Sequence, residues 1–138
     1  GGGMSIPFLA CMVATAAFFH LPPRVLPSIQ AVEGGQIGSV HVNANGTADL
    51  GVMQVNTIWI GPLARYARLE PEVVTRRMIY DPCFNIAASG AIMRTYIAQA
   101  HGDLMLAIGY YHSHTPALST RYEQQVLTAA GRMFSGYR

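Results

Sequence analysis

The sequence predicts a mostly helical domain of the α+β class with one small β element. Apolar residues recur at helical spacing over most of the chain, and proline and glycine separate these stretches. Between residues 36 and 50 the helical spacing is lost, and an Asn-Gly pair indicates a turn. With 138 residues, 51% of them hydrophobic, the chain is long enough for one core but too short for two. We therefore expect a single domain over residues 4–138.

The N-terminal part is predicted to form a buried helix over residues 8–19. Gly1–Gly3, which precede it, are interpreted as a cloning remnant. The apolar stretch is too short to span a bilayer, and it lacks the basic flank and the cleavage pattern of a signal peptide. We therefore expect no membrane-spanning segment here. Leu21-Pro22-Pro23 ends the helix, because proline removes a backbone donor and restricts the residue before it.

A second helix is predicted over residues 24–33, where the apolar residues fall on one face and two glycines follow. Residues 40–42 then have the composition of a short strand that enters a turn at residues 43–47. A small β-hairpin or an ordered loop is therefore expected near residues 36–50.

Helical patterning resumes after this element and continues to the end of the chain. Asp81 and Pro82 start the long central helix, because aspartate caps helices and proline suits their first position. Asp103 can cap the next helix, and the break at residues 113–116 precedes the last one. The predicted helical segments are 52–56, 58–67, 71–76, 82–101, 103–110 and 118–134.

The charge of the chain argues against nucleic acid as a partner. The net charge is +2, from nine arginines against seven acidic residues. This excess is small and dispersed, whereas nucleic-acid binding requires a concentrated basic surface. A mild preference for an anionic polymer is the most that it supports.

Glu33 is the strongest candidate for a catalytic group. It lies at the C-terminal end of an apolar helix and faces two glycines. Partial desolvation and the carbonyl groups of the helix end would both raise the pKa of this carboxyl, which is what a general acid needs near neutral pH. The alternative is an ordinary exposed glutamate at a helix end.

Residues 48–56 combine side chains that suit a sugar-binding groove. Gln54 and Asn56 carry amides that match sugar hydroxyls, and Met53 could pack on the apolar face of a pyranose ring. Asp49 is the nearest acid to Glu33 along this stretch and is a possible second catalytic acid, although its position before Leu-Gly fits a turn-capping role equally well.

Residues 109–116 contain two tyrosines before a polar break. A phenol here could hydrogen-bond near a scissile bond, or it could belong to aromatic core packing. His112 and His114 form a pair that invites a metal, but no third ligand of suitable type and spacing accompanies them. We therefore expect no metal site.

The two cysteines, Cys11 and Cys83, are either unrelated buried thiols or a disulfide pair. A disulfide between them would close a loop of about 73 residues and stabilise the fold by roughly 4 kcal/mol, less any strain.

Taken in chain order, three motifs resemble the catalytic domain of the soluble-lytic-transglycosylase family, which has a goose-type-lysozyme-like fold. They are Val-Glu-Gly-Gly at residues 32–35, Asp-Leu-Gly-Val-Met-Gln-Val-Asn at 49–56 and Gly-Tyr-Tyr-His-Ser at 109–113. The resemblance extends from Cys11 to about Tyr122. It is closest to the short members that accompany type IV secretion, conjugation and related cell-envelope machines, which the stretch at residues 81–86 also resembles.

The resemblance implies a role for each matching residue. Glu33 and Tyr111 would be the catalytic residues, Glu33 as the acid and base and Tyr111 close to it, and Cys11 would pair with Cys83. The residues implied in the groove and in substrate binding are Gly51, Met53, Gln54, Asn56, Tyr110 and His112. Two positions depart from the family pattern: Gly34 stands where serine is usual, and His112 where asparagine is usual. The serine that would orient the carboxyl is therefore missing.

The activity implied is cleavage of peptidoglycan between N-acetylmuramic acid and N-acetylglucosamine, with closure of a 1,6-anhydro ring and no cofactor. One alternative is a lysozyme-like hydrolase in which Asp49 positions water. Another is a non-catalytic module that binds the wall. We expect a periplasmic monomer whose signal peptide is either absent from this sequence or has been removed. Its expected partners are glycan strands and components of a secretion or conjugation machine.

Overall fold

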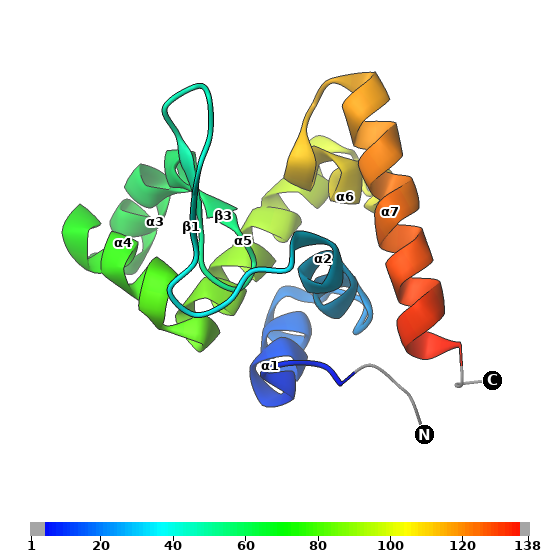
Figure 1. Cartoon of the computed structure of the whole chain (residues 1–138), viewed down its shortest axis with the longest axis horizontal. Coiled ribbons are helices and arrows are strands. Elements are labelled where there is room, and N and C mark those ends of the chain that lie inside the picture. The colour runs from blue at the N-terminus through cyan, green and yellow to red at the C-terminus, as the bar shows by residue number, and fades with distance from the viewer. Residues whose placement is uncertain (1–4, 136–138) are drawn as a thin grey trace.

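The computed structural model describes residues 5–135 of the chain. Gly1–Gly3, interpreted above as a cloning remnant, lie outside the described residues. Within them the chain is mostly helical with a small antiparallel sheet, as predicted (Figure 1). The elements are α1 (Leu9–Phe19), α2 (Val25–Glu33), β1 (Val40–Val42), β2 (Ala48–Leu50), β3 (Val55–Asn56), the 3-10 helix η1 (Thr57–Trp59), α3 (Ile60–Ala67), α4 (Pro71–Tyr80), α5 (Pro82–Gln99), α6 (Leu104–His112) and α7 (Pro116–Phe134).

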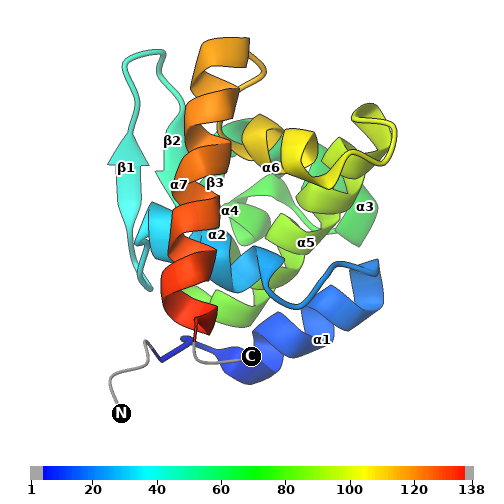
Figure 2. The same cartoon turned by 90° about the vertical axis from the view of Figure 1, so that its right-hand side faces the viewer.

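The helix α5 runs through the middle of the molecule and separates two groups of elements. Figure 1 shows the sheet, α3 and α4 on one side of it and α6 and α7 on the other. Contacts of α5 with α1, α4 and α6 build the core around it, and α7 packs on both α2 and α6, as Figure 2 shows for α2. The end of α2 therefore lies where the two groups meet.

The three strands form one antiparallel sheet in the order β1, β2, β3. Val40 pairs with Leu50 and Val42 with Ala48, so the predicted hairpin near residues 36–50 is confirmed. The helix predicted over residues 52–56 is wrong. Gly51 and Gln54 adopt φ values of 69° and 52°, which break a helix, and the chain makes a tight turn between β2 and β3 instead.

The helix start signals are confirmed, whereas several helix ends differ by a few residues. The Asp81 carboxylate accepts a hydrogen bond from the Phe84 N–H at 3.0 Å, and Asp103 caps α6 in the same way. The central helix ends at Gln99 and not at His101, because His101 has a φ of 53°. Conversely, α4 continues to Tyr80 and α7 begins at Pro116, beyond their predicted limits.

The N-terminal helix is clamped onto α5 at two places. The disulfide between Cys11 and Cys83 is present, with a Cα–Cα distance of 5.4 Å. Near the other end of α1, the Arg94 guanidinium donates hydrogen bonds to the carbonyls of Phe19 and His20 at 2.9 and 2.8 Å. These contacts fix α1 although it has no side-chain cap.

The prediction that the first helix is buried holds for one of its faces only. Met12, Thr15 and Ala16 are buried against the core, while Val13 and Phe18 on the outer face are exposed. No helix between residues 5 and 135 is both long enough and apolar enough to cross a membrane.

Candidate active site

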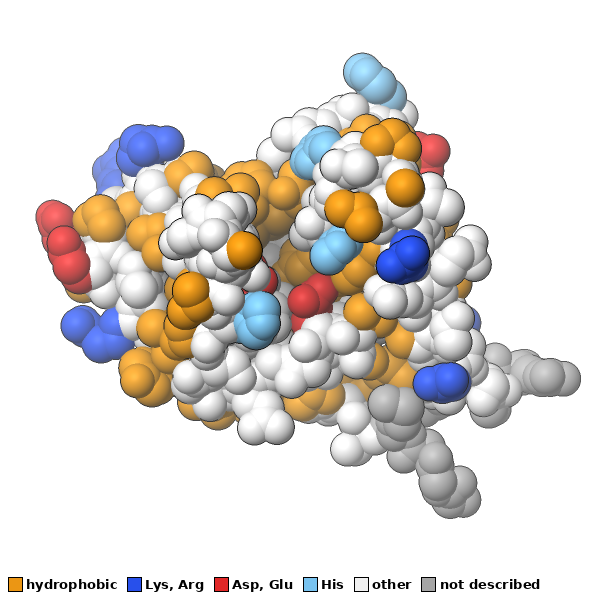
Figure 3. Space-filling view, turned by 45° about the horizontal axis from the view of Figure 1, so that its top comes forward, with side chains coloured by type: hydrophobic (Ala, Val, Ile, Leu, Met, Phe, Trp, Pro, Cys, Tyr) orange, Lys and Arg blue, Asp and Glu red, His pale blue; other side chains and the backbone are white. Residues whose placement is uncertain are grey.

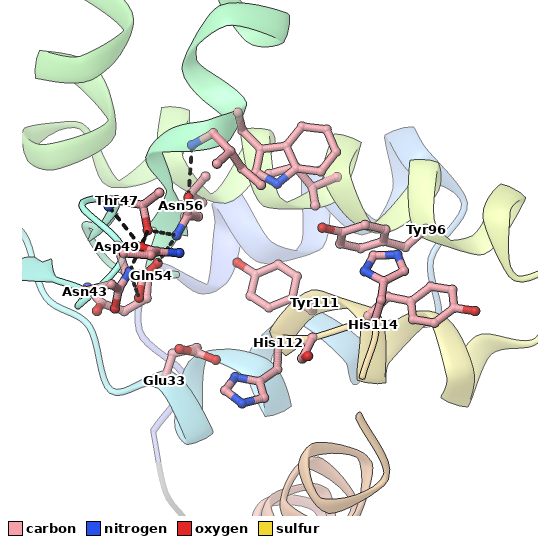
Figure 4. A pocket seen from close by; sticks show the side chains of 17 residues that line it. Glu33, Asn43, Thr47, Asp49, Gln54, Asn56, Tyr96, Tyr111, His112 and His114 are labelled. Carbon is pink, nitrogen blue, oxygen red and sulfur yellow. Dashed lines mark hydrogen bonds between the residues drawn. The ribbon is translucent and has the colours of Figure 1, made fainter. Parts of the chain in front are cut away.

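A cleft of about 380 Å³ lies between the sheet and the helices α5 and α6, a size typical of ligand sites. Figure 3 shows a hollow with acidic side chains at its bottom and histidines at its rim. In Figure 4 the polar groups around Asp49 lie on one side of the pocket, and Tyr96 and His114 lie on the other. The lining includes Glu33, Asn43, Asn45, Thr47, Asp49, Gln54, Asn56, Trp59, Tyr96, Tyr110, Tyr111, His112 and His114.

Glu33 is the last residue of α2, and its half-buried side chain reaches the cleft. Gly34 ends the helix with a φ of 67°, and its N–H donates to the Gln30 carbonyl at 2.8 Å. At Gly35 a Cβ would collide with the backbone oxygen of Gly51. Glycine at 34 thus provides the left-handed turn and glycine at 35 the close approach, which together place Glu33 beside the turn after β2.

The Glu33 carboxylate is held by a tyrosine from the last helix. The Tyr122 hydroxyl donates a hydrogen bond to Glu33 Oε2 at 2.6 Å. Tyr122 is 3% exposed, and its ring lies nearly parallel to those of Tyr111 and His112, with centroids 6.5 and 5.1 Å away. This bond orients the Glu33 carboxylate, which the neighbouring Gly34 has no side chain to contact.

The pKa of Glu33 is raised above its ordinary value of 4.5, as predicted from the sequence. Burial is the largest cause, and the negative charge of Asp49 raises the pKa further, whereas the hydrogen bond from Tyr122 lowers it. Burial and the nearby Glu33 charge raise the pKa of Tyr122 far above its usual range, so its hydroxyl stays a donor. The carboxyl therefore has the setting of a general acid.

Asp49 faces the same cleft from β2, within a network of amides. Its carboxylate accepts hydrogen bonds from the side-chain amides of Asn43 at 3.2 Å and Asn56 at 2.9 Å. Both amides also donate to the Thr47 hydroxyl at 3.1 Å. The turn-capping role considered for Asp49 is wrong, because the residue lies in a strand and its carboxylate bonds to side chains.

Tyr111 lines the cleft, but its hydroxyl is engaged with the backbone. It donates a hydrogen bond to the Met53 carbonyl at 2.8 Å, and burial raises its pKa well above the usual value. Because this bond uses the hydroxyl proton, the geometry does not favour donation by Tyr111 near a scissile bond. The bond instead fastens α6 to the turn that carries Met53.

Gly51 and Met53 do not reach the cleft. Met53 is 0% exposed and packs in the core, so its side chain cannot contact a sugar ring. Gly51 is buried where a Cβ would collide with the Met78 carbonyl and crowd Asn85. The fully buried Asn85 side chain bonds to the Leu50 and Met78 carbonyls and to the Met53 N–H at 2.8 to 2.9 Å. These residues shape the turn beneath the site.

Gln54 and Asn56, by contrast, do line the cleft, as predicted. The Gln54 amide donates to the Gly51 carbonyl at 3.1 Å, which leaves its oxygen available to a ligand. The Asn56 amide nitrogen is used by Asp49 and Thr47, and its oxygen accepts from the Ile58 N–H.

The far end of the cleft is aromatic. The rings of Tyr110 and His114 stack at 4.1 Å with an interplanar angle of 14°, and Tyr96 packs edge-on between His114 and Trp59. His112 stacks on a different ring, that of Tyr122, so the two histidines do not act as a pair. No group of three metal-ligating side chains occurs within residues 5–135.

The sequence missed Tyr122, Asn43, Thr47 and Trp59 as site residues. Tyr122 is 89 positions from Glu33 and reaches it only through the packing of α7 on α2. Nothing in its local sequence distinguishes it from an ordinary core tyrosine.

No protein-family model matches the chain. The chain is 24% identical over 106 residues to the invasion protein IagB of Salmonella typhimurium, and it matches IagB of Salmonella typhi equally. The match covers 76% of this chain and 62% of each relative, so the chain spans less than two thirds of their length. The likeness is distant.

Proposed function

We propose that the protein is a lytic transglycosylase that cleaves the glycan strands of peptidoglycan, with Glu33 as its acid and base. The observation that carries this proposal is the half-buried Glu33 side chain, whose carboxyl has a raised pKa and is held by Tyr122 at a cleft lined with amides and aromatic rings. The motif resemblance and the distant similarity to IagB support a wall-cleaving enzyme of lysozyme-like type.

The reaction proceeds in two steps around one carboxyl. Protonated Glu33 gives its proton to the glycosidic oxygen, and the bond from that oxygen to C1 of the muramic residue breaks. The resulting carboxylate, which Tyr122 stabilises by its hydrogen bond, then takes the proton of the C6 hydroxyl. The C6 oxygen bonds to C1 and closes the anhydro ring, so no water is consumed and Glu33 regains its proton.

Binding of the strand would use both kinds of lining. Gln54 and the exposed Asn45 offer amides to sugar hydroxyls and N-acetyl groups, while Trp59 and Tyr110 offer ring faces. His112, exposed at the rim beside Tyr122, would contact the sugar nearest to Glu33. No cofactor takes part in this scheme.

Hydrolysis by the same cleft is the second candidate, and Asp49 is the observation that favours it. A carboxylate fixed by Asn43 and Asn56 opposite an acid is the arrangement of two-carboxyl glycosidases. Mass spectrometry of the released muropeptides distinguishes the two reactions. An anhydro end is lighter than a reducing end by one water, and only hydrolysis incorporates label from ¹⁸O-water. Anhydro products support the transglycosylase, and labelled reducing ends support the hydrolase.

The Cys11–Cys83 disulfide supports export to an oxidising compartment, and we propose the periplasm. We also propose that the protein works beside a secretion or conjugation machine that must cross the wall, and this part of the proposal rests on the motif resemblance alone. We further propose that residues 4–138 form one catalytic domain that acts as a monomer. Cell fractionation and light scattering of the purified protein test the location and the oligomeric state. A non-catalytic wall-binding module would retain wall binding but release no muropeptides.

A further inference from the structure

An open groove of about 450 Å³ lies between α2 and α7, which pack side by side (Figure 2). The two helices run antiparallel. Tyr122 near the start of α7 bonds to Glu33 at the end of α2, and Phe134 at the end of α7 lies under the guanidinium of Arg24, just before α2. We call this hollow the α2–α7 groove. It is lined by Ala31, Val32, Arg121, Gln124, Gln125, Thr128, Ala129 and Arg132.

The lining of the groove has an apolar floor and polar edges. The half-buried side chains that form the floor are small and apolar, namely Ala31, Val32 and Ala129. The other side chains are exposed and polar, and two of them are the arginines at positions 121 and 132. These arginines are about three helical turns apart, or about 16 Å along α7. The groove therefore presents two positive charges on one side of a helix, with an apolar strip between α2 and α7 beside them.

No carboxylate of the described residues neutralises these charges. Within residues 5–135 neither Arg121 nor Arg132 has an ion pair or a hydrogen bond from its side chain, and no acidic side chain lines the groove. The acids closest in the sequence face elsewhere. Glu33 lines the catalytic cleft, and the stem of Glu123 lies against α6. The groove thus has an unopposed positive charge that suits an anionic partner.

A helix of another protein fits this shape better than a membrane does. A bilayer surface is flat and cannot fill a groove, and two arginines attract anionic lipids only weakly. The furrow between two helices accepts the ridge of side chains on a third helix. Carboxylates about three turns apart on that ridge would reach both arginines, and guanidinium groups bind carboxylates by two parallel hydrogen bonds.

We propose that the α2–α7 groove docks an acidic helical segment of a partner protein, with carboxylates at Arg121 and Arg132 and small side chains against the apolar floor. This inference goes beyond the proposed function and does not depend on it. Among the described residues the groove and the catalytic cleft share no lining side chain, so a docked partner leaves the cleft open to its substrate. Docking would hold the enzyme beside the partner while the cleft works.

The test measures binding of two labelled peptides by fluorescence anisotropy. The first is an alanine-rich helical peptide of about 20 residues with glutamates about three turns apart, and the second carries lysines in their place. We expect the wild type to bind the glutamate peptide about tenfold more tightly than the lysine peptide. The double variant Arg121→Glu/Arg132→Glu, at two exposed side chains, should reverse this preference.

The matched control is Arg65→Glu/Arg76→Glu, which changes the net charge equally. Both side chains are exposed and lie on α3 and α4, on the other side of α5 from α7 (Figure 1). This variant should keep the wild-type preference for the glutamate peptide. A preference reversed equally in the control would show an effect of net charge alone and would overturn the inference.

Equal affinity of the wild type for both peptides would also overturn it. So would sedimentation of the wild type with phosphatidylglycerol vesicles that is lost in Arg121→Glu/Arg132→Glu, because the groove would then bind an anionic membrane. Muropeptide release by the same double variant should equal that of the wild type. If the wild type released no muropeptides but kept its peptide preference, the proposed function would fail and the docking surface would stand.

Discussion

Glu33 and Asp49 lie in the same cleft but are held by different parts of the fold. Glu33 ends a helix, is desolvated and accepts a hydrogen bond from a buried tyrosine. Asp49 lies in the sheet, and its carboxylate accepts hydrogen bonds from the amides of Asn43 and Asn56. The same two amides also donate to the Thr47 hydroxyl. The comparison shows how one site gives two carboxyls different surroundings, which is how enzymes separate the role of an acid from that of an anion.

The largest effect is expected from removing the acid. Glu33→Gln keeps the shape of the side chain but cannot donate the proton, so wall cleavage should fall about 10²- to 10⁴-fold. Release of muropeptides from purified peptidoglycan measures it. Glu70→Gln, at an exposed glutamate outside the cleft, is the control and should retain wild-type activity. Equal rates for Glu33→Gln and the wild type would show that Glu33 is not the catalytic acid.

Removing the charge of Asp49, which faces the same cleft from the sheet, should have a smaller effect. Asp49→Asn is expected to slow cleavage about 10- to 100-fold, or about 1.4 to 2.7 kcal/mol at the barrier. Because the Asp49 charge raises the pKa of Glu33, its removal should lower that pKa. Activity that requires protonated Glu33 would then be lost at lower pH than in the wild type. An unchanged basic limb of the pH–rate profile would disprove this coupling.

Loss of the tyrosine that holds Glu33 should shift the profile in the opposite direction. Tyr122→Phe removes a hydrogen bond that lowers the pKa of Glu33, so the basic limb should move to higher pH. The rate at the optimum should fall about tenfold because the carboxyl is less well oriented. Tyr80→Phe, at an exposed tyrosine, controls for loss of a hydroxyl. A rate loss without a shift would mean that Tyr122 serves the packing of α7 alone.

The smallest effect concerns stability. Because the pKa of Glu33 is raised in the folded state, the folded protein binds more protons than the unfolded chain above pH 4.5. Its contribution is therefore present at low pH and is lost as pH rises through the folded pKa. The free energy of unfolding is measured with urea at several pH values from about 4 to about 7. It should decline more with rising pH in the wild type than in Glu33→Gln. Parallel curves would contradict the raised pKa.

Local signals in the sequence were enough to predict that the Glu33 carboxyl is partly desolvated. An apolar helix that ends in Glu33 before two glycines predicts a desolvated carboxyl, since both the burial and the helix end are local properties. The caps at Asp81 and Asp103 and the hairpin turn were predicted for the same reason. The pairing of the cysteines needed the family resemblance as well.

Contacts between distant segments could not be predicted in this way. Tyr122 reaches Glu33, 89 positions away, because α7 packs on α2. The turn at residues 51–54 was mistaken for helix because its apolar residues suit both structures. Met53 was placed in the groove because a methionine suits a sugar ring and because the resemblance implied it, although Asn85 and Tyr111 hold its backbone from within the core.

The most direct test is a titration of the Glu33 carboxyl carbon by NMR, in protein labelled with ¹³C at the glutamate carboxyls. The Glu33 signal is assigned by its absence from the spectrum of Glu33→Gln. We predict a midpoint above the ordinary value of 4.5, lower in Asp49→Asn and higher in Tyr122→Phe than in the wild type. A wild-type midpoint at or below 4.5 would contradict the assignment of Glu33 as a partly desolvated general acid.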